Sequence, residues 1–289
     1  MEQYTTIHTD LQTIEDLFSD IEFPELCRRM DLTETEYLAI KNEELTPTKE
    51  QLENIYNFAY NKGLFLNEIT WQEALDRYRE PGVDVVSHGA RTYIKGDVRL
   101  DVSGDSNDFA SGFYMGTDIA QGGMFVAGEP NASLYILTFQ PKGLKVAQFN
   151  VSVDWMLAVC WYRDKIPQYS ESRRIQKIRK KVDNCDYVLA PIADNKMFEV
   201  IDAFSAKEIT DLQCLYALSA THLGYQYVLK KEECLSHIDI KEHMYFCSVE
   251  KSMYNKQSDV ETNTSMNKAL IARKRYAGEG VYIDELLGN

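Results

Sequence analysis

The chain has 289 residues, of which 44% are hydrophobic, 11% aromatic and 26% charged, a composition typical of a globular chain and not of a disordered one. Its formal net charge of −14, from 45 acidic against 31 basic residues, opposes binding to nucleic acids or anionic membranes except through a local basic patch. The length predicts one domain of moderate size with a small companion.

The N-terminal segment has no basic start followed by an apolar core, and no apolar run reaches the roughly 18 residues of a membrane span. We therefore expect a cytoplasmic protein that has no membrane partner. Six cysteines are spread singly along the chain, which predicts reduced core thiols and no metal site.

Residues 1–72 predict a small helical domain. Apolar residues recur there with a period near 3.6, which indicates four or five short helices. Thr33 is followed three residues later by Glu36, and Thr48 by Gln51, and this spacing is typical of a capping box that binds the free N–H groups at a helix start.

Residues 23–67 resemble, in pattern, the helix-turn-helix of phage-repressor-like regulators. A recognition helix near residues 33–41 would present acidic side chains such as Glu34 and Glu36 where DNA readers place Arg, Gln or Asn. We therefore expect residues 1–70 not to bind double-stranded DNA tightly, and a protein-contact or scaffold role is the main alternative.

From Val83 the pattern changes to short runs of β-branched and aromatic residues separated by Gly, Pro and Asp, which predicts strands. The predicted strands cover residues 83–88, 134–139, 144–149, 186–190 and 225–229. Helices are expected over 155–182 and 209–218. Together they predict an α+β domain over residues 80–246.

The remaining residues, 247–289, are expected to form a polar linker over 248–268 and a last helix or arm over 269–287. The obvious basic patch is residues 173–181, in which six of nine residues are Arg or Lys and the apolar residues recur at helical spacing. It is either a solvated helix face or a surface that binds phosphate or a target.

Three short motifs follow one another at or near predicted strands. They are Ser87-His88-Gly89, Asp108-Phe109-Ala110-Ser111-Gly112-Phe113-Tyr114 and Tyr225-Gln226-Tyr227-Val228. In this order they resemble the signature positions of ADP-ribosyltransferases of the diphtheria-toxin and poly(ADP-ribose) polymerase branch, which read His-Gly, Phe-Gly-x-Gly-Ile-Tyr and Glu-Tyr-Ile/Val. The nearest likeness is to a bacterial, largely uncharacterised branch that carries an N-terminal helix-turn-helix-like domain. The resemblance implies a split β-sheet with helices.

The resemblance also implies NAD as co-substrate and gives roles to single residues. His88 would bind a ribose hydroxyl, the backbone of Gly89 would pair with the nicotinamide carboxamide, and Tyr114 would stack on the nicotinamide. The other residues of the expected NAD-binding set are Ala90, Phe109, Gly112, Phe113 and Thr117. Each has a structural alternative: His88 as a lone strand-end histidine, Tyr114 as core packing and Gly112 as a turn or bulge.

The sequence departs from the family pattern at its third position, where Gln226 stands in place of the glutamate. An amide hydrogen-bonds but lacks the full negative charge that stabilises an oxocarbenium-like transition state, so we expect weak turnover or none. On this reasoning Gln226→Glu should raise nicotinamide release about ten- to a hundredfold. Smaller departures are Ala110, which replaces a glycine, and Ala90, whose missing hydroxyl Thr117 could restore.

One further likeness to the bacterial branch lies at residues 190–195, where Asp194 would orient a loop, contact substrate or simply form an Asx-type turn. The sequence as a whole predicts a mono-ADP-ribosyltransferase that modifies an intracellular macromolecule, protein or nucleic acid, as a bacterial toxin or defence effector controlled by a regulatory or antitoxin protein. Two alternatives stay open: a catalytically idle NAD- or ADP-ribose-binding module, and an enzyme resembling RNA 2′-phosphotransferases.

Overall fold

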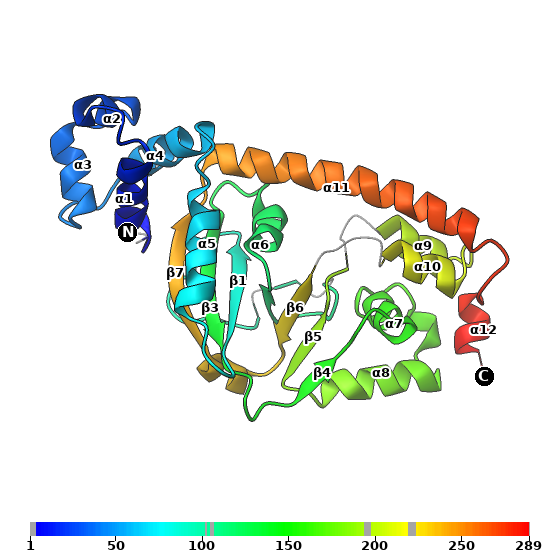
Figure 1. The fold of residues 1–289 in the computed structure, drawn as a ribbon. Helices are drawn as coiled ribbons and strands as arrows, with labels where there is room; N and C mark the ends of the chain where they lie inside the picture. Colours follow the sequence, from blue (N-terminus) through cyan, green and yellow to red (C-terminus); the bar gives the residue numbers. More distant parts are fainter. Residues whose placement is uncertain (1–3, 102, 105–106, 194–197, 219–223, 289) are drawn as a thin grey trace. The chain divides into compact units, whose positions relative to one another are not determined.

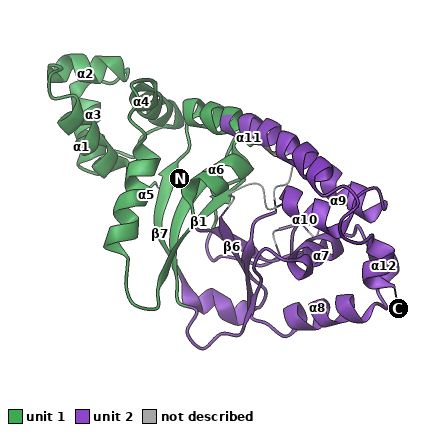
Figure 2. Cartoon of the chain, turned by 45° about the vertical axis from the view of Figure 1, so that its right-hand side comes forward, with its two compact units in different colours: residues 1–95, 118–140, 239–256 green, residues 96–117, 141–238, 257–289 purple. Residues whose placement is uncertain are grey.

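The computed structural model describes residues 4–288 except 102, 105–106, 194–197 and 219–223 (Figure 1). Helices and strands are both abundant, which confirms the α+β class in its coarse form. The chain divides into two compact units, coloured in Figure 2. Unit 1 comprises residues 1–95, 118–140 and 239–256, and unit 2 comprises residues 96–117, 141–238 and 257–289.

Unit 1 begins with five helices and contains three of the strands. The helices are α1 (Ile7–Leu17), α2 (Phe23–Arg29), α3 (Glu34–Lys41), α4 (Lys49–Asn61), α5 (Leu66–Arg77) and, later in the chain, α6 (Ile119–Val126). The strands are β1 (Asp84–Ala90), β3 (Ser133–Phe139) and β7 (Ile238–Tyr245). Helix α11 (Ser248–Arg275) begins in this unit.

Two of the N-terminal helices start as the sequence predicts. Thr33 caps α3 and Thr48 caps α4, each through a complete capping box with Glu36 or Gln51. Both side chains bind backbone N–H groups that have no partner inside the helix. The predicted capping boxes are therefore confirmed.

The core of the N-terminal helices includes residues from the far end of the chain. Tyr245 and Cys247 lie in the same buried cluster as apolar side chains of α1 to α5. The Asn67 Nδ2 donates to the Tyr245 carbonyl at 2.8 Å and to Glu250 Oε2 at 2.7 Å. Burial raises the pKa of Glu250 to about 8. Helices α1 to α5 therefore share one core with the junction of β7 and α11.

The strands of unit 1 run in the order β1-β3-β7, and β1 is antiparallel to β3 with His88 opposite Tyr135. One face of this sheet packs against α5 and α6 in a cluster that contains Trp71, Ile119 and Leu134. The other face carries aromatic rings, because neighbouring residues of a strand point to opposite sides. On that face the His243 ring stacks on Tyr135, with centroids 4.5 Å apart.

Unit 2 contains the other strands and a mainly helical cover. Its strands are β2 (Phe113–Gly116), β4 (Val146–Gln148), β5 (Tyr187–Pro191) and β6 (Tyr225–Leu229). Its helices are α7 (Val153–Tyr162), α8 (Arg173–Asp183), α9 (Phe198–Ser205), α10 (Asp211–Leu218) and α12 (Ile283–Leu287), with short 3-10 turns η1 (Pro167–Tyr169) and η3 (Glu232–His237).

The strands of unit 2 run in the order β4-β5-β6-β2. β4 and β5 are parallel, whereas β5–β6 and β6–β2 are antiparallel. Helix α7 is the centre of the core, since the six residues from Trp155 to Cys160 are all buried. A single helix over 155–182 was expected, but the chain forms α7 and α8 separated by η1. Pro167 begins that turn, and proline removes a helical hydrogen bond.

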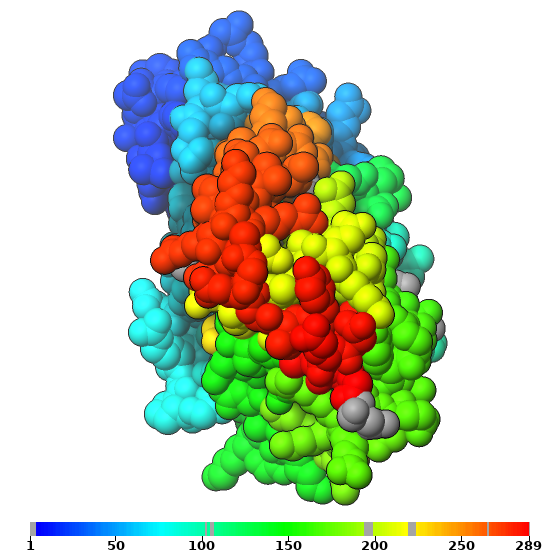
Figure 3. Space-filling model, turned by 90° about the vertical axis from the view of Figure 1, so that its right-hand side faces the viewer, coloured from blue at the N-terminus to red at the C-terminus, as the bar shows by residue number. Residues whose placement is uncertain are grey.

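The segment 248–268, expected to be a loose polar linker, is helical as part of α11. The C-terminal residues belong to the core of unit 2, where Ile283 and Leu287 are buried. The red C-terminal segment lies against the yellow α9–α10 region (Figure 3), and the Lys207 Nζ donates to Asp284 at 2.9 Å. The helix or arm expected over 269–287 is instead the end of α11, a turn and the short helix α12, and its last residues pack on unit 2.

All six cysteines are buried and carry free thiols, as expected for core residues. In the described part of the chain, no helix combines the length and the apolar character that crossing a membrane requires.

Candidate functional site

A buried polar network in unit 2 centres on Asp108. The Arg163 Nε donates to Asp108 Oδ1 at 2.9 Å, and the Ala193 N–H donates to Asp108 Oδ2 at 3.0 Å. Both members of the ion pair are only 5% exposed. A buried charge is tolerated when it is paired and hydrogen-bonded, so this network fixes the start of the second motif against α7.

Gln226, the third motif residue, belongs to the same network. Its Nε2 donates to Asp108 Oδ2 at 2.7 Å and to the Pro191 carbonyl at 3.3 Å, and the side chain is 6% exposed. Both neighbours are acceptors, so the amide nitrogen must face them. The Trp155 Nε1 donates to the same Pro191 carbonyl at 3.0 Å. Within the described residues, only the amide oxygen of Gln226 remains for a ligand.

Tyr114 and Gln226 lie on one face of the β2–β6 pair. Tyr114 is opposite Val228 and Gly116 is opposite Gln226, and residues two apart on a strand share a face. The half-buried Tyr114 ring packs against the core, and its hydroxyl donates to the Ala110 carbonyl at 2.7 Å. Burial raises the pKa of Tyr114 well above its usual value. The structure therefore brings these two predicted site residues onto one face of the paired strands.

The loop that joins Asp108 to β2 is held tightly. Ala110 has φ of +57°, a left-handed conformation that costs a residue with a Cβ about 1–2 kcal/mol and that glycine adopts freely. The Lys230 Nζ donates to the Phe109 carbonyl at 2.6 Å and also to the Ser111 carbonyl. A Cβ on Gly112 would lie 2.6 Å from the Leu229 carbonyl oxygen, so glycine is required for close approach to β6.

The other predicted residues of unit 2 are placed as follows. Phe109 and Phe113 are buried, and the Phe109 ring lies 5.5 Å from Phe149, so both pack in the core. Thr117 is exposed, and its Oγ1 accepts from the Tyr225 N–H at 3.2 Å. The hydroxyl of Thr117 thus binds the start of β6. Asp194 lies outside the described residues.

The first motif lies on β1 in unit 1. His88 is half-buried, and its ring centroid lies 6.4 Å from that of Tyr135 on β3. A Cβ on Gly89 would lie 2.2 Å from the Gly122 carbonyl oxygen, so glycine here allows α6 to pack on the strand. Ala90 is buried at the end of β1. Gly89 therefore has a structural role that holds with or without NAD.

The contacts of Gln226 change the expectation for Gln226→Glu. A glutamate in the same position would direct an oxygen at Asp108 and at the Pro191 carbonyl, both of which are acceptors. The substitution therefore removes two hydrogen bonds from a buried network, a cost that reasoning from the sequence did not include.

The comparisons with known proteins address the family of the chain. The sequence profile of a family described as "Protein of unknown function (DUF3990)" matches residues 85–240, just over half of the chain. The chain belongs to this family. The matched span contains all three motifs. No curated protein and no solved structure matches the chain.

Within the DUF3990 span, sequence reasoning missed three residues that organise the site: Arg163, Lys230 and Trp155. The sequence signal that could have indicated them is the carboxylate of Asp108 at the start of the aromatic second motif, because a buried carboxylate requires a cationic or N–H partner. Among the described residues, no group of three or more His, Cys, Asp or Glu side chains could hold a metal ion.

Proposed function

We propose that the chain is an NAD-using mono-ADP-ribosyltransferase that modifies a macromolecular acceptor. The observation that carries the proposal is the placement of Tyr114 and Gln226 on one face of the paired strands β2 and β6. This arrangement supports the resemblance of the second and third motifs, because a nicotinamide-stacking ring and a ribose-binding group must serve one ligand. By the same resemblance, His88 contributes a ribose contact from β1.

In the proposed reaction the bond between nicotinamide and ribose breaks, and its electron pair passes to the pyridinium nitrogen. The acceptor nucleophile then forms the new bond to the ribose carbon and releases a proton. The transition state resembles an oxocarbenium ion, so orientation and nearby partial charges matter more than a protein nucleophile. The amide oxygen of Gln226 supplies a partial negative charge, whereas the Asp108 charge is paired with Arg163.

That charge pairing favours a second candidate function, a module that binds NAD or ADP-ribose without cleaving it. Its basis is that the Gln226 nitrogen is committed to Asp108 and Pro191, which gives the site a rigid amide and, among the described residues of this network, no unpaired carboxylate. Such a module recognises NAD or ADP-ribose and transfers no ADP-ribose to an acceptor.

Calorimetric titration with NAD and with ADP-ribose tests both functions, and nicotinamide release in the presence of a cell lysate separates them. His88→Ala should weaken NAD binding at least tenfold, since it removes a ligand contact. His8→Ala is the matched control, because His8 is also half-buried but lies in α1. Tyr114→Phe should keep NAD binding, because the stacking ring remains.

The outcomes are distinct. Binding together with release supports the transferase. Binding of NAD without release supports the binding module. If the folded protein binds neither ligand at millimolar concentration, both proposals are wrong. If His88→Ala and His8→Ala bind NAD equally well, His88 is not part of the NAD site.

A further inference from the structure

Helix α8 concentrates positive charge in a chain that is otherwise acidic. Six of its eleven residues are Arg or Lys, and one, Asp183, is acidic, whereas the whole chain carries −14. The basic residues are Arg173, Arg174, Lys177, Arg179, Lys180 and Lys181. A local field of this sign attracts polyanions that the rest of the surface repels.

Three of these cations form one stripe on the outer side of α8. Ile175, Ile178 and Val182 are buried in the core of unit 2 and fix which side faces inward. With 3.6 residues per turn, Arg173, Lys177 and Lys180 lie within about 60° of one another on the opposite side, along about 10 Å of helix. All three are exposed, and within the described residues none forms an ion pair.

The remaining basic residues are held by neighbours in unit 2. The Arg174 Nε donates to Asp154 at 2.8 Å. The Arg179 guanidinium lies 5.0 Å from the centroid of the Trp161 ring, and the Lys181 ammonium lies 4.0 Å from that of Phe149. Among the residues that the structure describes, Arg173, Lys177 and Lys180 thus have no acidic partner, while the half-buried Trp161 ring lies beside Arg179.

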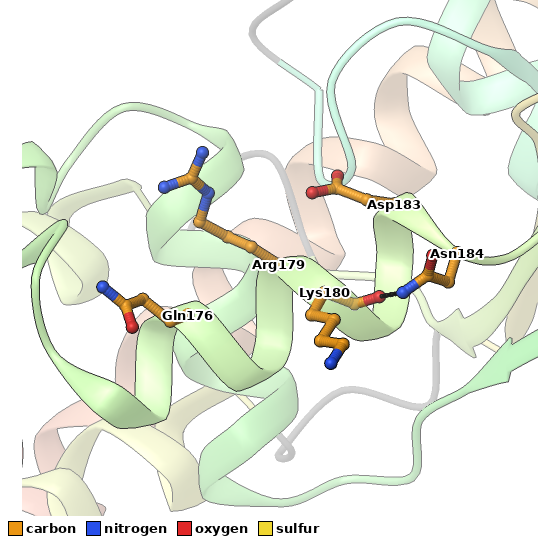
Figure 4. A pocket seen from close by; sticks show the side chains of 5 residues that line it. All are labelled: Gln176, Arg179, Lys180, Asp183 and Asn184. Atoms are coloured by element: carbon orange, nitrogen blue, oxygen red, sulfur yellow. Dashed lines mark hydrogen bonds between the residues drawn. The ribbon is translucent and has the colours of Figure 1, made fainter.

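A hollow of about 300 Å³ adjoins the stripe (Figure 4). Its lining residues are all polar: Gln176, Arg179, Lys180, Asp183 and Asn184. It offers amide, guanidinium and ammonium donors, with the Asp183 carboxylate as its single acidic group. An apolar side chain of a protein partner would find no matching pocket here, whereas a hydrated sugar and phosphate would find donors.

We propose that this outer surface of α8 binds the sugar-phosphate backbone of a single nucleic-acid strand. A line of exposed cations along the helix matches a line of phosphates, and the half-buried Trp161 ring beside Arg179 is a surface on which an unpaired base stacks. Membrane binding does not fit, because a membrane-bound helix inserts its apolar face and that of α8 is buried in the core. The proposal does not depend on NAD chemistry.

Fluorescence anisotropy with a short labelled RNA strand tests the proposal on the full-length protein without NAD. If three phosphates are neutralised, the logarithm of the association constant should fall with the logarithm of salt concentration with a slope of about −2. The triple variant Arg173→Ala, Lys177→Ala, Lys180→Ala should lose at least tenfold in affinity at low salt, and its slope should approach zero.

The matched control is the triple variant Lys62→Ala, Lys142→Ala, Lys274→Ala, which changes the net charge equally at exposed positions on other elements. Circular dichroism verifies that both variants fold. Equal losses in the two variants, or no RNA binding by the wild type at low salt, would overturn the proposal. A labelled duplex that binds as tightly as the single strand, or polyglutamate that competes as well as unlabelled RNA, would also overturn it. Single-stranded DNA that binds like RNA supports backbone recognition.

Discussion

Substituting Gln226 by glutamate tests whether the buried amide is structural. The change replaces a nitrogen that donates to Asp108 at 2.7 Å and to the Pro191 carbonyl at 3.3 Å by an acceptor oxygen. It removes one hydrogen bond to a charged group, about 1.5–3 kcal/mol, and one neutral bond, about 0.5–1.5 kcal/mol. We expect the free energy of unfolding at neutral pH to fall by roughly 2–4 kcal/mol. We expect no increase in nicotinamide release.

The loss should depend on pH. When the carboxyl group introduced by Gln226→Glu is protonated, it can donate to Asp108 again, so burial and the adjacent carboxylate raise its pKa in the folded state above the usual value of about 4.3. The folded variant then binds this proton more tightly than the unfolded chain. The stability that the variant loses relative to the wild type is smallest at pH values below the pKa of this group in the unfolded chain. The loss grows as pH rises through its pKa in the folded protein, by up to about 1.4 kcal/mol per pH unit.

Urea denaturation followed by tryptophan fluorescence measures this effect, because Trp155 and Trp161 both lie in α7 of unit 2. Gln148→Glu is the control, since Gln148 is exposed on β4 of the same unit. The reasoning is refuted if Gln226→Glu unfolds at the wild-type urea concentration at both acidic and alkaline pH.

Three other changes have defined outcomes. Ala110→Gly removes the strain of a left-handed residue with a Cβ, and the larger entropy of glycine in the unfolded chain offsets part of that gain. We expect the free energy of unfolding in urea to rise by about 0.5–1 kcal/mol, whereas the control Ala120→Gly inside α6 should lower it by about 1 kcal/mol. Because burial raises the pKa of Glu250 from 4.5 to about 8, its neutral form favours folding at low pH, and stability falls as pH rises across that window; Glu250→Gln should flatten this dependence of the urea midpoint. Gly89→Ala places a Cβ 2.2 Å from a carbonyl oxygen of α6 and should cost about 1–3 kcal/mol in thermal denaturation, unlike Gly128→Ala, which meets open space.

Local signals in the sequence predicted local structure well. The capping boxes at Thr33 and Thr48 and the runs that became β1, β3, β5 and β6 depend on neighbours a few residues away. The part of α11 over 248–268 was missed because it has no apolar face, and its exposed turns are stabilised by contacts such as the Gln257 Nε2 donating to Glu261 at 2.9 Å. β7 was missed because charged residues such as Lys241 interrupt its apolar pattern.

The candidate site was only partly predictable for a different reason. His88 and Gln226 lie in predicted strands, so their elements could be predicted, whereas β2, which carries Tyr114, was not among the predicted strands. Asp108 and its partner Arg163 are 55 residues apart in the sequence, and Asp108 and Gln226 are 118 residues apart. Spacing in the sequence carries no information on such contacts. The reason that an amide suits position 226 therefore became visible only from the packing of the loop against β6.

The contact between Asp108 and Gln226 implies that the two positions must change together. Asp108→Asn combined with Gln226→Glu exchanges the amide and the carboxylate, so that a donor again faces an acceptor at 2.7 Å. The Ala193 N–H, which donates to Asp108 Oδ2, loses its acceptor in the exchange, so recovery is partial. We expect the double variant to be more stable than the sum of the single changes predicts, with a coupling energy of about 1–3 kcal/mol in a double-mutant cycle. Additive single changes would show that the two side chains do not act as a pair. The exchange also places a carboxylate where ADP-ribosyltransferases have one: nicotinamide release above the wild-type rate supports the transferase, and NAD binding without release supports the binding module.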